Sequence, residues 1–592
     1  MTDRADMINS VVIHDAAQRQ WLHFQHPKRI ISAHRIEEVL PALKTIEEQV
    51  YLRGLYAAGF IAYEAAPAFD SALAVQKDGL FPLLWFGIYG KPEQINLPTT
   101  TPSIQDLPRT WTPSVTRAEY EHALSRIKHY IEAGDTYQVN FTVRLRSPFR
   151  GDPWSYFIEL ARAQDASYGA FVNAKDWIIC SASPELFFQL DGDELISRPM
   201  KGTASRGMML RDDLEQADWL QHSEKNRAEN VMIVDMVRND MGRIAAIGSV
   251  EVRSLYEVER YPTLWQMTST VRAKTGAGLC EIMQALFPPA SITGAPKRRT
   301  MQIIAELEQT PRRIYTGSVG FMGPDRKAQF NVAIRTVLVD KAKGQAEYGV
   351  GGGIVWDSVD RIEFEECQTK AKIITQTVPD FALLETILWT PEQGYFLLPY
   401  HLTRLMDSAA YFFFSADRDA IRTKLDSLAH TLPKTAHKVR LLLAKDGGIT
   451  LQSEVLHDAV AQPLHVCLAA TAVDSANPFL YHKTTNRVVY EQALAACPGY
   501  LDVILWNEKG EVTESSIANI VVELDGKLYT PPIPCGLLPG TYRAYLLEQG
   551  KVKERVIRKE DLSSSPHIYL VNSVRKEREV VVDSFDGAEA SV

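Results

Sequence analysis

The chain has 592 residues, of which 45% are hydrophobic and 23% charged, and its formal net charge is −9. This is the composition of a globular protein, and the acidic balance provides no broad basic surface for nucleic acid or anionic lipid. No run approaches the ~20 apolar residues that cross a bilayer, and the first residues lack an apolar signal core. We therefore expect a cytoplasmic protein with more than one domain, which binds neither nucleic acid nor membrane.

The six cysteines lie far apart, without a CxxC pair or a compact framework. Such spacing is typical of reduced thiols and predicts neither disulfides nor a zinc site. They are Cys180, Cys280, Cys367, Cys467, Cys497 and Cys535.

The chain divides best in the stretch TQTVPD, at residues 375–380. The preceding stretch, EFEECQTKAKII, has a helical pattern in which Glu366 and Lys370 stand four residues apart. The following stretch, FALLETILWTPEQGYFLLPYHL, predicts a strand, a turn and a second strand. We therefore expect a first domain of residues 1–375 and a second of residues 380–592.

The first part mixes short apolar strands, such as WIICSAS and GSVGFMG, with amphipathic helices. No regular helical crossover separates these strands, so the pattern predicts an α+β fold with large, mainly antiparallel sheets. The clearest helix is SEKNRAENVMIVDMVRNDMG, in which Ser223 suits the N-cap and Gly242 the C-cap position.

Three glutamates on two predicted helices would form a hard oxygen site for Mg²⁺ if they converge. They are Glu229, which shares a helix face with Met232 and Ile233, and the pair Glu363 and Glu366. Solvated helix glutamates are the alternative. The stretches SITGAPK and YGVGGGIV fit neither a Walker loop nor a dinucleotide fingerprint. Their backbone N–H groups could hold a carboxylate, or they could simply form turns.

The stretch SRPMKGTASRG places Lys201 in a predicted loop, just before a Gly-Thr pair. Taken alone, a lysine is most often a solvated surface charge. The alternative is a positioned amine, which acts as a nucleophile only when burial or nearby positive charge lowers its pKa. Arg198 and Arg206 flank Lys201 and are candidates for that charge.

Nine segments favour the positioned amine over the surface charge, because they follow one another in the order that is found in the chorismate-utilising enzymes. That family includes anthranilate synthase component I, aminodeoxychorismate synthase component I and isochorismate synthase, and the resemblance covers roughly residues 115–375. The segments are SPELFF, PMKGTASRG, EKNRAENVMIVDMVRND, VERYPTLWQM, SITGAPK, YTGSVGFM, FNVAIRT, GVGGGIVWDS and EFEECQTKAK.

The resemblance implies a chorismate pocket and a Mg²⁺ that holds a substrate carboxylate, with Glu229, Glu363 and Glu366 at the metal. The lysine loop is written P-x-A-G-T in anthranilate synthases and P-x-K-G-T in aminodeoxychorismate synthases. Lys201 therefore resembles a covalent nucleophile, and Glu185 resembles the acid that protonates the leaving hydroxyl. The implied substrate contacts are Thr293, Arg335, Gly351, Gly352, Gly353 and Lys370.

Two further positions bear on the product and its source of nitrogen. Isochorismate synthases carry a water-activating lysine where this chain has Gln138, which cannot act as a base, so an amine product is favoured. Gln266 stands where the family usually has a histidine. The sequence has no G-x-C-x-G elbow. We therefore expect ammonia from a separate glutamine amidotransferase subunit, with free ammonia as the alternative.

The second part contains the residue types that pyridoxal 5′-phosphate needs: a lysine, a carboxylate for the pyridine nitrogen and a cation for the phosphate. The stretches HLTRL, K-x-x-N-R, E-x-x-x-x-N and L-x-P-G-x-x-R resemble the fold-type IV enzymes that use this cofactor. The resemblance implies that Lys483 is the Schiff-base lysine and general base and that Glu514 partners the pyridine nitrogen. Arg404, Thr541 and Ser573 would contact the phosphate, and the resemblance allows a homodimer through this part.

Together the two resemblances imply a bifunctional enzyme. It would aminate chorismate to 4-amino-4-deoxychorismate and then eliminate pyruvate to give 4-aminobenzoate, a folate precursor. One alternative is an anthranilate synthase component I fused to a branched-chain or D-amino-acid type aminotransferase, against which Lys201 argues. Another is a ligand-binding regulator built on degenerate enzyme domains, but a binder needs no nucleophile.

Overall fold

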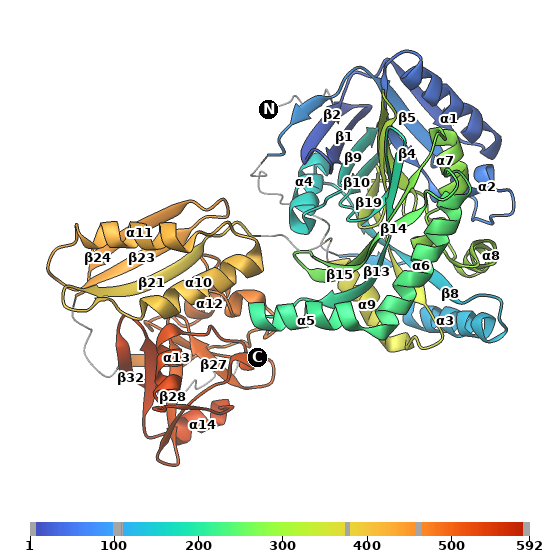
Figure 1. Ribbon diagram of the computed structural model, residues 1–592. Helices are drawn as coiled ribbons and strands as arrows, with labels where there is room; N and C mark the ends of the chain where they lie inside the picture. Colours follow the sequence, from blue (N-terminus) through green and yellow to red (C-terminus); the bar gives the residue numbers. More distant parts are fainter. Residues whose placement is uncertain are drawn as a thin grey trace. The chain divides into compact units, whose positions relative to one another are not determined.

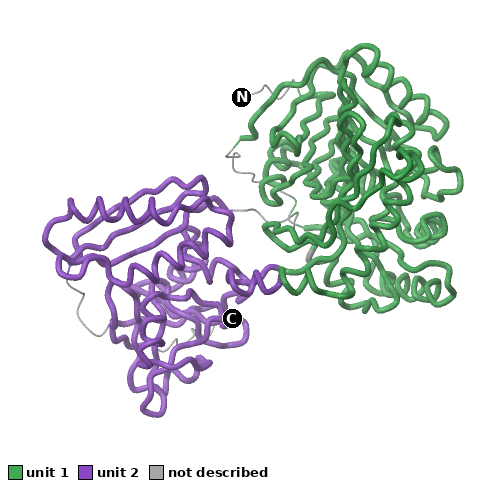
Figure 2. Tube along the Cα trace, in the orientation of Figure 1, with its two compact units in different colours: residues 1–205, 217–378 green, residues 206–216, 379–592 purple. Residues whose placement is uncertain are grey.

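The chain separates into two compact units (Figure 2). Unit 1 comprises residues 1–205 and 217–378, and unit 2 comprises residues 206–216 and 379–592. The computed structural model describes residues 7–98, 110–372, 379–457 and 464–583, together with Pro108 and Ile374. The predicted boundary at residues 375–380 therefore falls mostly outside the described residues.

Unit 1 contains two ten-stranded sheets whose strands pair in antiparallel fashion (Figure 1). The strands are β1 (Ser10–Asp15), β2 (Gln20–Phe24), β3 (Arg29–Ala33), β4 (Tyr56–Ile61), β5 (Leu84–Tyr89), β6 (Glu93–Ile95), β7 (Thr112–Pro113), β8 (Gln138–Pro148), β9 (Ala170–Ala174), β10 (Trp177–Ser181), β11 (Leu186–Asp191), β12 (Glu194–Arg198), β13 (Met200–Ser205), β14 (Glu251–Arg260), β15 (Leu264–Lys274), β16 (Gly294–Ala295), β17 (Ser318–Gly323), β18 (Lys327–Asn331), β19 (Thr336–Asp340) and β20 (Gln345–Ile354).

One sheet has the order β16-β8-β20-β19-β10-β9-β1-β2-β6, with β7 beside β8. The other has the order β13-β15-β12-β11-β18-β17-β4-β5-β3, with β14 beside β15. The sheets face each other across an apolar core that includes Val11, Phe60, Trp85, Ile179 and Leu338. The predicted α+β fold with large, mainly antiparallel sheets is confirmed.

Helices cover the outer face of each sheet in unit 1. The helices α3 (Arg117–Glu132), α4 (Pro153–Gln164), α8 (Lys297–Leu307) and α9 (Asp360–Lys372) pack on the sheet that contains β8. The helices α1 (Ile36–Tyr51), α6 (Glu224–Gly242) and α7 (Leu279–Leu286) pack on the other. The remaining helices that begin in the first part are α2 (Ala66–Phe69) and α5 (Leu210–His222).

The start of α6 was predicted correctly and its end was not. Ser223 caps the helix by accepting a hydrogen bond from the backbone N–H of Asn226. Gly242 is the last helical residue, and Arg243 caps the helix in the right-handed conformation. The chain leaves this helix without a left-handed residue, so a C-cap glycine is not needed there.

The loop predicted around Lys201 is wrong, because most of it forms strand β13, which pairs with β15. The register shifts between Met200 and Thr203, and Gly202 adopts φ +97° within this irregularity. Glycine accepts this φ at low steric cost. Residues that suggested a tight loop therefore mark a β-bulge inside a strand.

Unit 2 contains a four-stranded antiparallel sheet and an eight-stranded mixed sheet, in the orders β22-β21-β23-β24 and β27-β26-β25-β32-β31-β28-β29-β30. The strands are β21 (Leu383–Thr390), β22 (Gly394–Tyr395), β23 (His437–Leu443), β24 (Ile449–Val455), β25 (Leu464–Leu468), β26 (Val503–Trp506), β27 (Val512–Ser515), β28 (Asn519–Leu524), β29 (Lys527–Thr530), β30 (Lys553–Glu554), β31 (Ile568–Asn572) and β32 (Lys576–Asp583). The helices are α10 (Leu398–Phe412), α11 (Arg418–Ala429), α12 (Val488–Ala495), α13 (Thr541–Glu548) and α14 (Lys559–Ser564).

The strand, turn and strand predicted at the start of the second part is correct only for β21 and the turn. The second strand is the two-residue β22, and the stretch PYHL belongs to α10. A proline in the first turn of α10 is compatible with a helix start, because its missing N–H would have no helical partner there.

Cys467 and Cys497 form a disulfide in unit 2, so the expectation of six unpaired thiols is wrong for this pair. Strand β25 and the turn after α12 bring these residues together across 30 positions, a spacing that no short motif marks. The other four cysteines are free and buried. In the part of the chain that the structure describes, no helix has both the length and the apolar character needed to cross a membrane.

Candidate active sites in the two units

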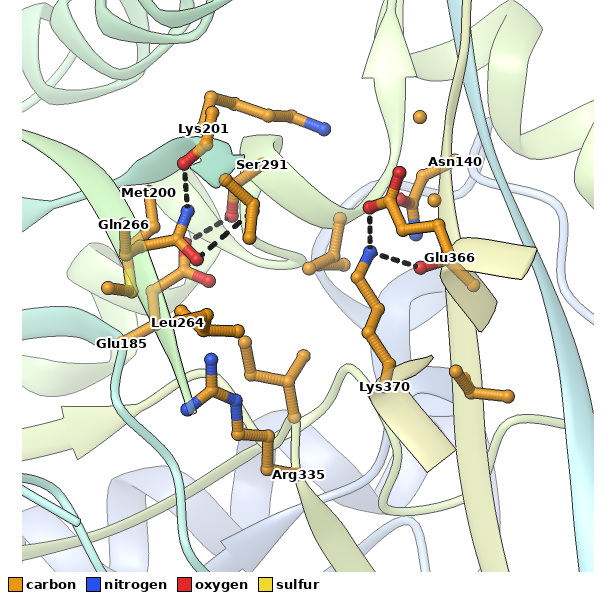
Figure 3. A pocket seen from close by; sticks show the side chains of 18 of the residues that line it. Asn140, Glu185, Met200, Lys201, Leu264, Gln266, Ser291, Arg335, Glu366 and Lys370 are labelled. Carbon is orange, nitrogen blue, oxygen red and sulfur yellow. Dashed lines mark hydrogen bonds and ion pairs between the residues drawn. The ribbon is translucent and has the colours of Figure 1, made fainter. Parts of the chain in front are cut away.

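A cavity of about 220 Å³ in unit 1 gathers most of the residues predicted for the chorismate site (Figure 3). Residues of β13, β20, α6 and α9 line it, together with the residue just before β11. The predicted residues that line it are Glu185, Lys201, Glu229, Arg335, Gly351, Gly352, Gly353, Glu363, Glu366 and Lys370.

Glu185 and Lys201 lie on the same side of this cavity, and Glu366 and Lys370 lie on the other (Figure 3). The strands β11 and β12 form an antiparallel hairpin in which Leu186 pairs with Arg198. Residues just outside this pair therefore return to the same end of the hairpin. The hairpin thus brings Glu185 and the segment that contains Lys201 to the same end of these strands.

The surroundings of Lys201 shift its amine toward the neutral form. Burial lowers its pKa, the charge of Glu229 opposes this, and the charge of Lys370 lowers the pKa further. Arg198 and Arg206 were the predicted candidates for this positive charge, and that prediction is wrong. Arg198 is paired with glutamates of β14, and Arg206 belongs to unit 2.

Glu185 has the properties of a general acid. It is 3% exposed, and burial raises its pKa to about 7. Its Oε1 accepts a 2.6 Å hydrogen bond from Ser291 Oγ, which favours the charged form and limits this rise. This raised pKa favours the protonated carboxyl, which proton donation requires. Ser291 lies 106 positions from Glu185, and its role was not predicted from the sequence.

The three predicted metal ligands line one cavity without forming a complete cluster. Glu363 accepts a 2.7 Å hydrogen bond from Ser358 Oγ, and burial raises its pKa. Glu366 pairs with Lys370 at 2.7 Å, and this charge lowers the pKa of the carboxyl. Among the described residues, no three His, Cys, Asp or Glu side chains are grouped to hold a metal. These glutamates would fit Mg²⁺ only with a further oxygen ligand, such as a substrate carboxylate.

The Gly351–Gly353 stretch of β20 leaves space in the cavity. A Cβ on Gly353 would collide with the amide of Gln138 and lie 2.8 Å from Lys201 Nζ. Gln138 is 1% exposed, and its Oε1 has no hydrogen-bond partner among the described residues. Only glycine at position 353 therefore allows the lysine amine and this amide to approach the same part of the cavity.

The two other predicted substrate contacts differ in position. Arg335 lines the cavity and donates a 3.0 Å hydrogen bond to Gln164, and burial lowers its pKa. Thr293 does not line the cavity, and its hydroxyl donates to the Ala290 carbonyl at 3.2 Å. The neighbouring Ser291 lines it in its place. The contact of Thr293 with the substrate therefore stays a prediction, and Ser291 is the side chain of this segment that lines the cavity.

Gln266 supports the bulge that carries the lysine. It lines the cavity, and its Nε2 donates a 2.7 Å hydrogen bond to the Gly202 carbonyl. Its Oε1 accepts a hydrogen bond from Thr203 Oγ1 at 3.3 Å. In this chain, the position where the family usually has a histidine therefore holds an amide bonded to the backbone beside Lys201.

A second cavity, of about 420 Å³, lies in unit 2. Burial lowers the pKa of Lys483 to about 8, and the charge of Arg404 contributes to this. Burial raises the pKa of Glu514 to about 7, and Tyr490 Oη donates a 2.8 Å hydrogen bond to it. All five residues predicted for the cofactor line this cavity: Arg404, Lys483, Glu514, Thr541 and Ser573.

Arg404 is held by a carboxylate and a backbone carbonyl that no sequence motif marks. Glu385 accepts two hydrogen bonds from it, at 2.9 and 2.6 Å, and the Pro539 carbonyl accepts a third at 3.1 Å. Burial alone would raise the pKa of Glu385, but Arg404 and then His401 lower it to about 2. A guanidinium has five N–H groups, so two remain for an anion.

The start of α13 provides further donors for an anion. Gly540 and Thr541 both line the cavity, and the first backbone N–H groups of a helix lack helical partners. Ser573, just after β31, is 6% exposed, and its hydroxyl bonds to the Thr386 carbonyl at 3.4 Å. A helix start, hydroxyls and a guanidinium suit a phosphate, and the buried lysine and glutamate suit a pyridoxal ring. The residues present therefore fit pyridoxal 5′-phosphate.

Comparison with known families agrees with this geometry. Residues 9–376 match the family described as chorismate binding enzyme, and residues 382–581 match amino-transferase class IV. The first match covers more than half of the chain, so the protein belongs to the chorismate-binding enzymes. The class IV match implies pyridoxal 5′-phosphate in unit 2. Both predicted family resemblances are confirmed.

Curated relatives of this chain include aminodeoxychorismate synthases and anthranilate synthases. Aminodeoxychorismate synthase component 1 of Salmonella typhimurium is 40% identical over 279 residues, which are 47% of this chain and 61% of that protein. Anthranilate synthase component 1 1 of Haloarcula marismortui is 37% identical over 304 residues, 49% of this chain and 62% of that protein. The chain thus spans about three fifths of the length of these relatives.

A solved structure supports the fold of unit 1. Anthranilate synthase component I from Streptococcus pneumoniae is 23% identical in sequence, with a TM-score of 0.52. The match covers 64% of this chain and 93% of that chain. At this identity the likeness shows the fold alone.

Proposed function

We propose that the protein makes 4-aminobenzoate from chorismate and ammonia. Unit 1 would form 4-amino-4-deoxychorismate, and unit 2 would eliminate pyruvate from it. The observation that carries the proposal is the position of Lys201, whose amine lies in the same cavity as Glu185 and the three glutamates of α6 and α9. A cavity that only binds a carboxylate has no need of a lysine with a lowered pKa beside a buried acid with a raised one.

In unit 1, neutral Lys201 attacks C2 of chorismate, and the C4–O bond breaks. Glu185 gives its proton to the departing hydroxyl, which leaves as water. Ammonia then forms a bond to C4 and expels the lysine from C2, so the amine is regenerated. Burial favours both starting protonation states, because it disfavours the ammonium of Lys201 and the carboxylate of Glu185.

Magnesium belongs to this proposal as a ligand of Glu229, Glu363 and Glu366 together with a substrate carboxylate. When bound, it would neutralise that carboxylate beside the acidic residues. Lys370 pairs with Glu366 and donates to the Gly351 carbonyl at 2.9 Å. It therefore fixes the orientation of one ligand and supplies a positive charge near the substrate.

In unit 2, Lys483 would bind the cofactor and take the proton from the amine-bearing carbon of the substrate. With a pKa of about 8, the amine is neutral in a useful fraction of molecules near neutral pH. Pyridoxal 5′-phosphate, when bound, supplies the electron sink for this proton loss. Glu514 would lie at the pyridine nitrogen, and Arg404, Thr541 and Ser573 at the phosphate. Loss of pyruvate then leaves an aromatic ring.

The enzyme would also need a source of ammonia. The relatives named component 1 support a separate glutamine amidotransferase subunit as the source of ammonia. Cytoplasmic location, a role in folate synthesis and a homodimer through unit 2 remain predictions from the sequence.

Anthranilate synthesis is the second candidate, because a relative of that name is 37% identical. It differs in needing no covalent lysine, since ammonia would attack C2 directly. Lys201 lines the cavity and lies close to Gly353, so an amine that can act as the covalent nucleophile is present. The geometry therefore favours 4-amino-4-deoxychorismate.

The test is product identification. The purified protein is incubated with chorismate, ammonium and Mg²⁺, with and without added pyridoxal 5′-phosphate. We expect 4-aminobenzoate and pyruvate in equal amounts, and 4-amino-4-deoxychorismate when the cofactor has been removed. Anthranilate as the main product would refute the assignment of unit 1, and an unchanged product after cofactor removal would refute that of unit 2.

A further inference from the structure

Residues 206–216 have an unexpected place in the molecule. They lie within the part that matches the chorismate-binding enzymes, yet they pack as part of unit 2 (Figure 2). They follow β13 directly and include the first residues of α5. Neither of the two cavities described above is lined by a residue of this segment. The segment therefore has a role in unit 2 that the chemistry of unit 1 does not explain.

Arg206 anchors this segment to α10. The Arg206 side chain is 6% exposed, pairs with Asp213 at 2.6 Å and donates a 3.0 Å hydrogen bond to the Tyr411 carbonyl. Its guanidinium lies 4.4 Å from the centre of the Tyr411 ring. Tyr411 Oη in turn donates to the Gly207 carbonyl at 2.9 Å. Two hydrogen bonds and a cation–π contact thus join the segment to one tyrosine.

The segment also determines which ring nitrogen of His482 carries the proton. Burial lowers the pKa of this histidine to about 4, so the ring is neutral at physiological pH. Its Nε2 lies 3.0 Å from the Met208 carbonyl, which can only accept, so Nε2 carries the proton. Nδ1 must then accept the 2.9 Å hydrogen bond from Ser408 Oγ. The carbonyl of Met208 therefore selects one tautomer of the ring.

Stacking extends this arrangement. The ring of Tyr411 lies 4.4 Å from that of His482 at an interplanar angle of 30°. Met208 and Met209 pack against the apolar cluster of unit 2 that contains Leu480 and Tyr481, just before the histidine. The segment thus makes a hydrogen bond to His482 and packs against the apolar residues just before it.

His482 directly precedes Lys483, whose carbonyl accepts a 2.9 Å hydrogen bond from the Leu384 N–H. We propose that residues 206–216 are a positioning element of the unit 2 site, in which Arg206 and the Met208 carbonyl hold His482 and thereby the backbone of Lys483. This inference rests on the proposed cofactor site. The proposed site of unit 2 then requires residues 206–216. This requirement does not follow from the resemblance to class IV enzymes, because that resemblance begins only after these residues in the chain.

The test measures how full-length variants bind pyridoxal 5′-phosphate after the cofactor has been removed. Arg206→Ala should raise the apparent Kd at least tenfold and reduce the visible circular dichroism per bound cofactor at saturation. Arg211→Ala is the matched control on the same segment, since its side chain is 81% exposed and pairs only with Asp212 and Glu215 among the described residues. Its Kd should stay within twofold of the parent value.

Tyr411→Phe is the milder variant, because it keeps the ring and removes only the hydrogen bond to the Gly207 carbonyl. It should raise the Kd about threefold to tenfold, and it carries the test if Arg206→Ala does not fold. Parent-like affinity and circular dichroism in both variants, or in Tyr411→Phe alone in that case, would overturn the inference even if the melting temperature falls. A parent protein that binds no cofactor would instead refute the assignment of unit 2.

Discussion

The hydrogen bond between Ser291 and Glu185 allows the proton donor of unit 1 to be tested through its pKa. Burial raises that pKa to about 7, and the 2.6 Å bond from Ser291 Oγ limits the rise by favouring the carboxylate. Such a bond to a charged group is worth about 1.5–3 kcal/mol. Because one pKa unit corresponds to about 1.36 kcal/mol, Ser291→Ala should raise the pKa of Glu185 by about one to two units.

The sign of the effect on rate follows from the role of the acid. Glu185 must be protonated to act, so activity declines as pH rises through its pKa, and a higher pKa moves this decline to higher pH. The ratio of variant to parent rates cancels the ionisation of ammonia, which is common to both. For a shift of about one unit, this ratio should be constant below about pH 6 and should rise about tenfold by pH 9.

The assay follows ammonia-dependent consumption of chorismate from pH 6 to 9 under single-turnover conditions. Ser318→Ala is the control, because it also removes a buried serine hydroxyl, one that donates to the Asn331 carbonyl at 2.6 Å and does not line the cavity. Its rate ratio should be flat. A flat ratio for Ser291→Ala as well would refute the assignment of Glu185 as the proton donor.

The other predictions concern the two lysines and a buried ion cluster. Lys201→Ala should abolish formation of 4-aminobenzoate from chorismate but not from supplied 4-amino-4-deoxychorismate, and full activity from chorismate would rule out the nucleophile. Lys483→Ala should let 4-amino-4-deoxychorismate accumulate, since loss of a general base alone costs about 10²–10⁴ in rate, and an unchanged rate would contradict its role. Mixing these two variants should restore 4-aminobenzoate, whereas an inactive mixture would mean that the intermediate is not released. Glu308→Ala should destabilise unit 1 by about 3–5 kcal/mol in urea unfolding, because it leaves the buried Arg144 and Arg312 without their carboxylate. A loss below about 1 kcal/mol would show that this cluster does not stabilise the fold.

Features that depend on near neighbours could be predicted from the sequence. Ser223 caps α6, and Glu366 pairs with Lys370 one helical turn away on α9. These interactions need only a helix, and the periodic pattern of the chain predicts one. The family motifs also carry information on distant residues, which is why most of the predicted site residues line the two cavities.

Contacts between distant segments could not be predicted. Ser291 donates to Glu185 across 106 positions. Lys370 supplies the positive charge near Lys201 for which Arg198 and Arg206 were the candidates. A charged residue that is near Lys201 in the sequence need not lie near its amine in space, because successive side chains of a strand point to opposite faces of the sheet. Which cation approaches Lys201 depends on how β13, β20 and α9 pack, and no local pattern specifies that.

Unit 2 is built from two separate stretches of the chain, so it can fold only after the second stretch has been synthesised. Residues 206–216 are translated about 160 residues before the rest of unit 2 begins at residue 379. At about 5–20 residues per second, this is a delay of roughly 8–30 seconds. The bond from His482 to the Met208 carbonyl closes a loop of 274 positions, among the long-range contacts that form slowly. Tyr411 and His482, which the segment contacts in unit 2, are therefore synthesised much later than Arg206 and Met208. The second site can form only after nearly the whole chain has been made.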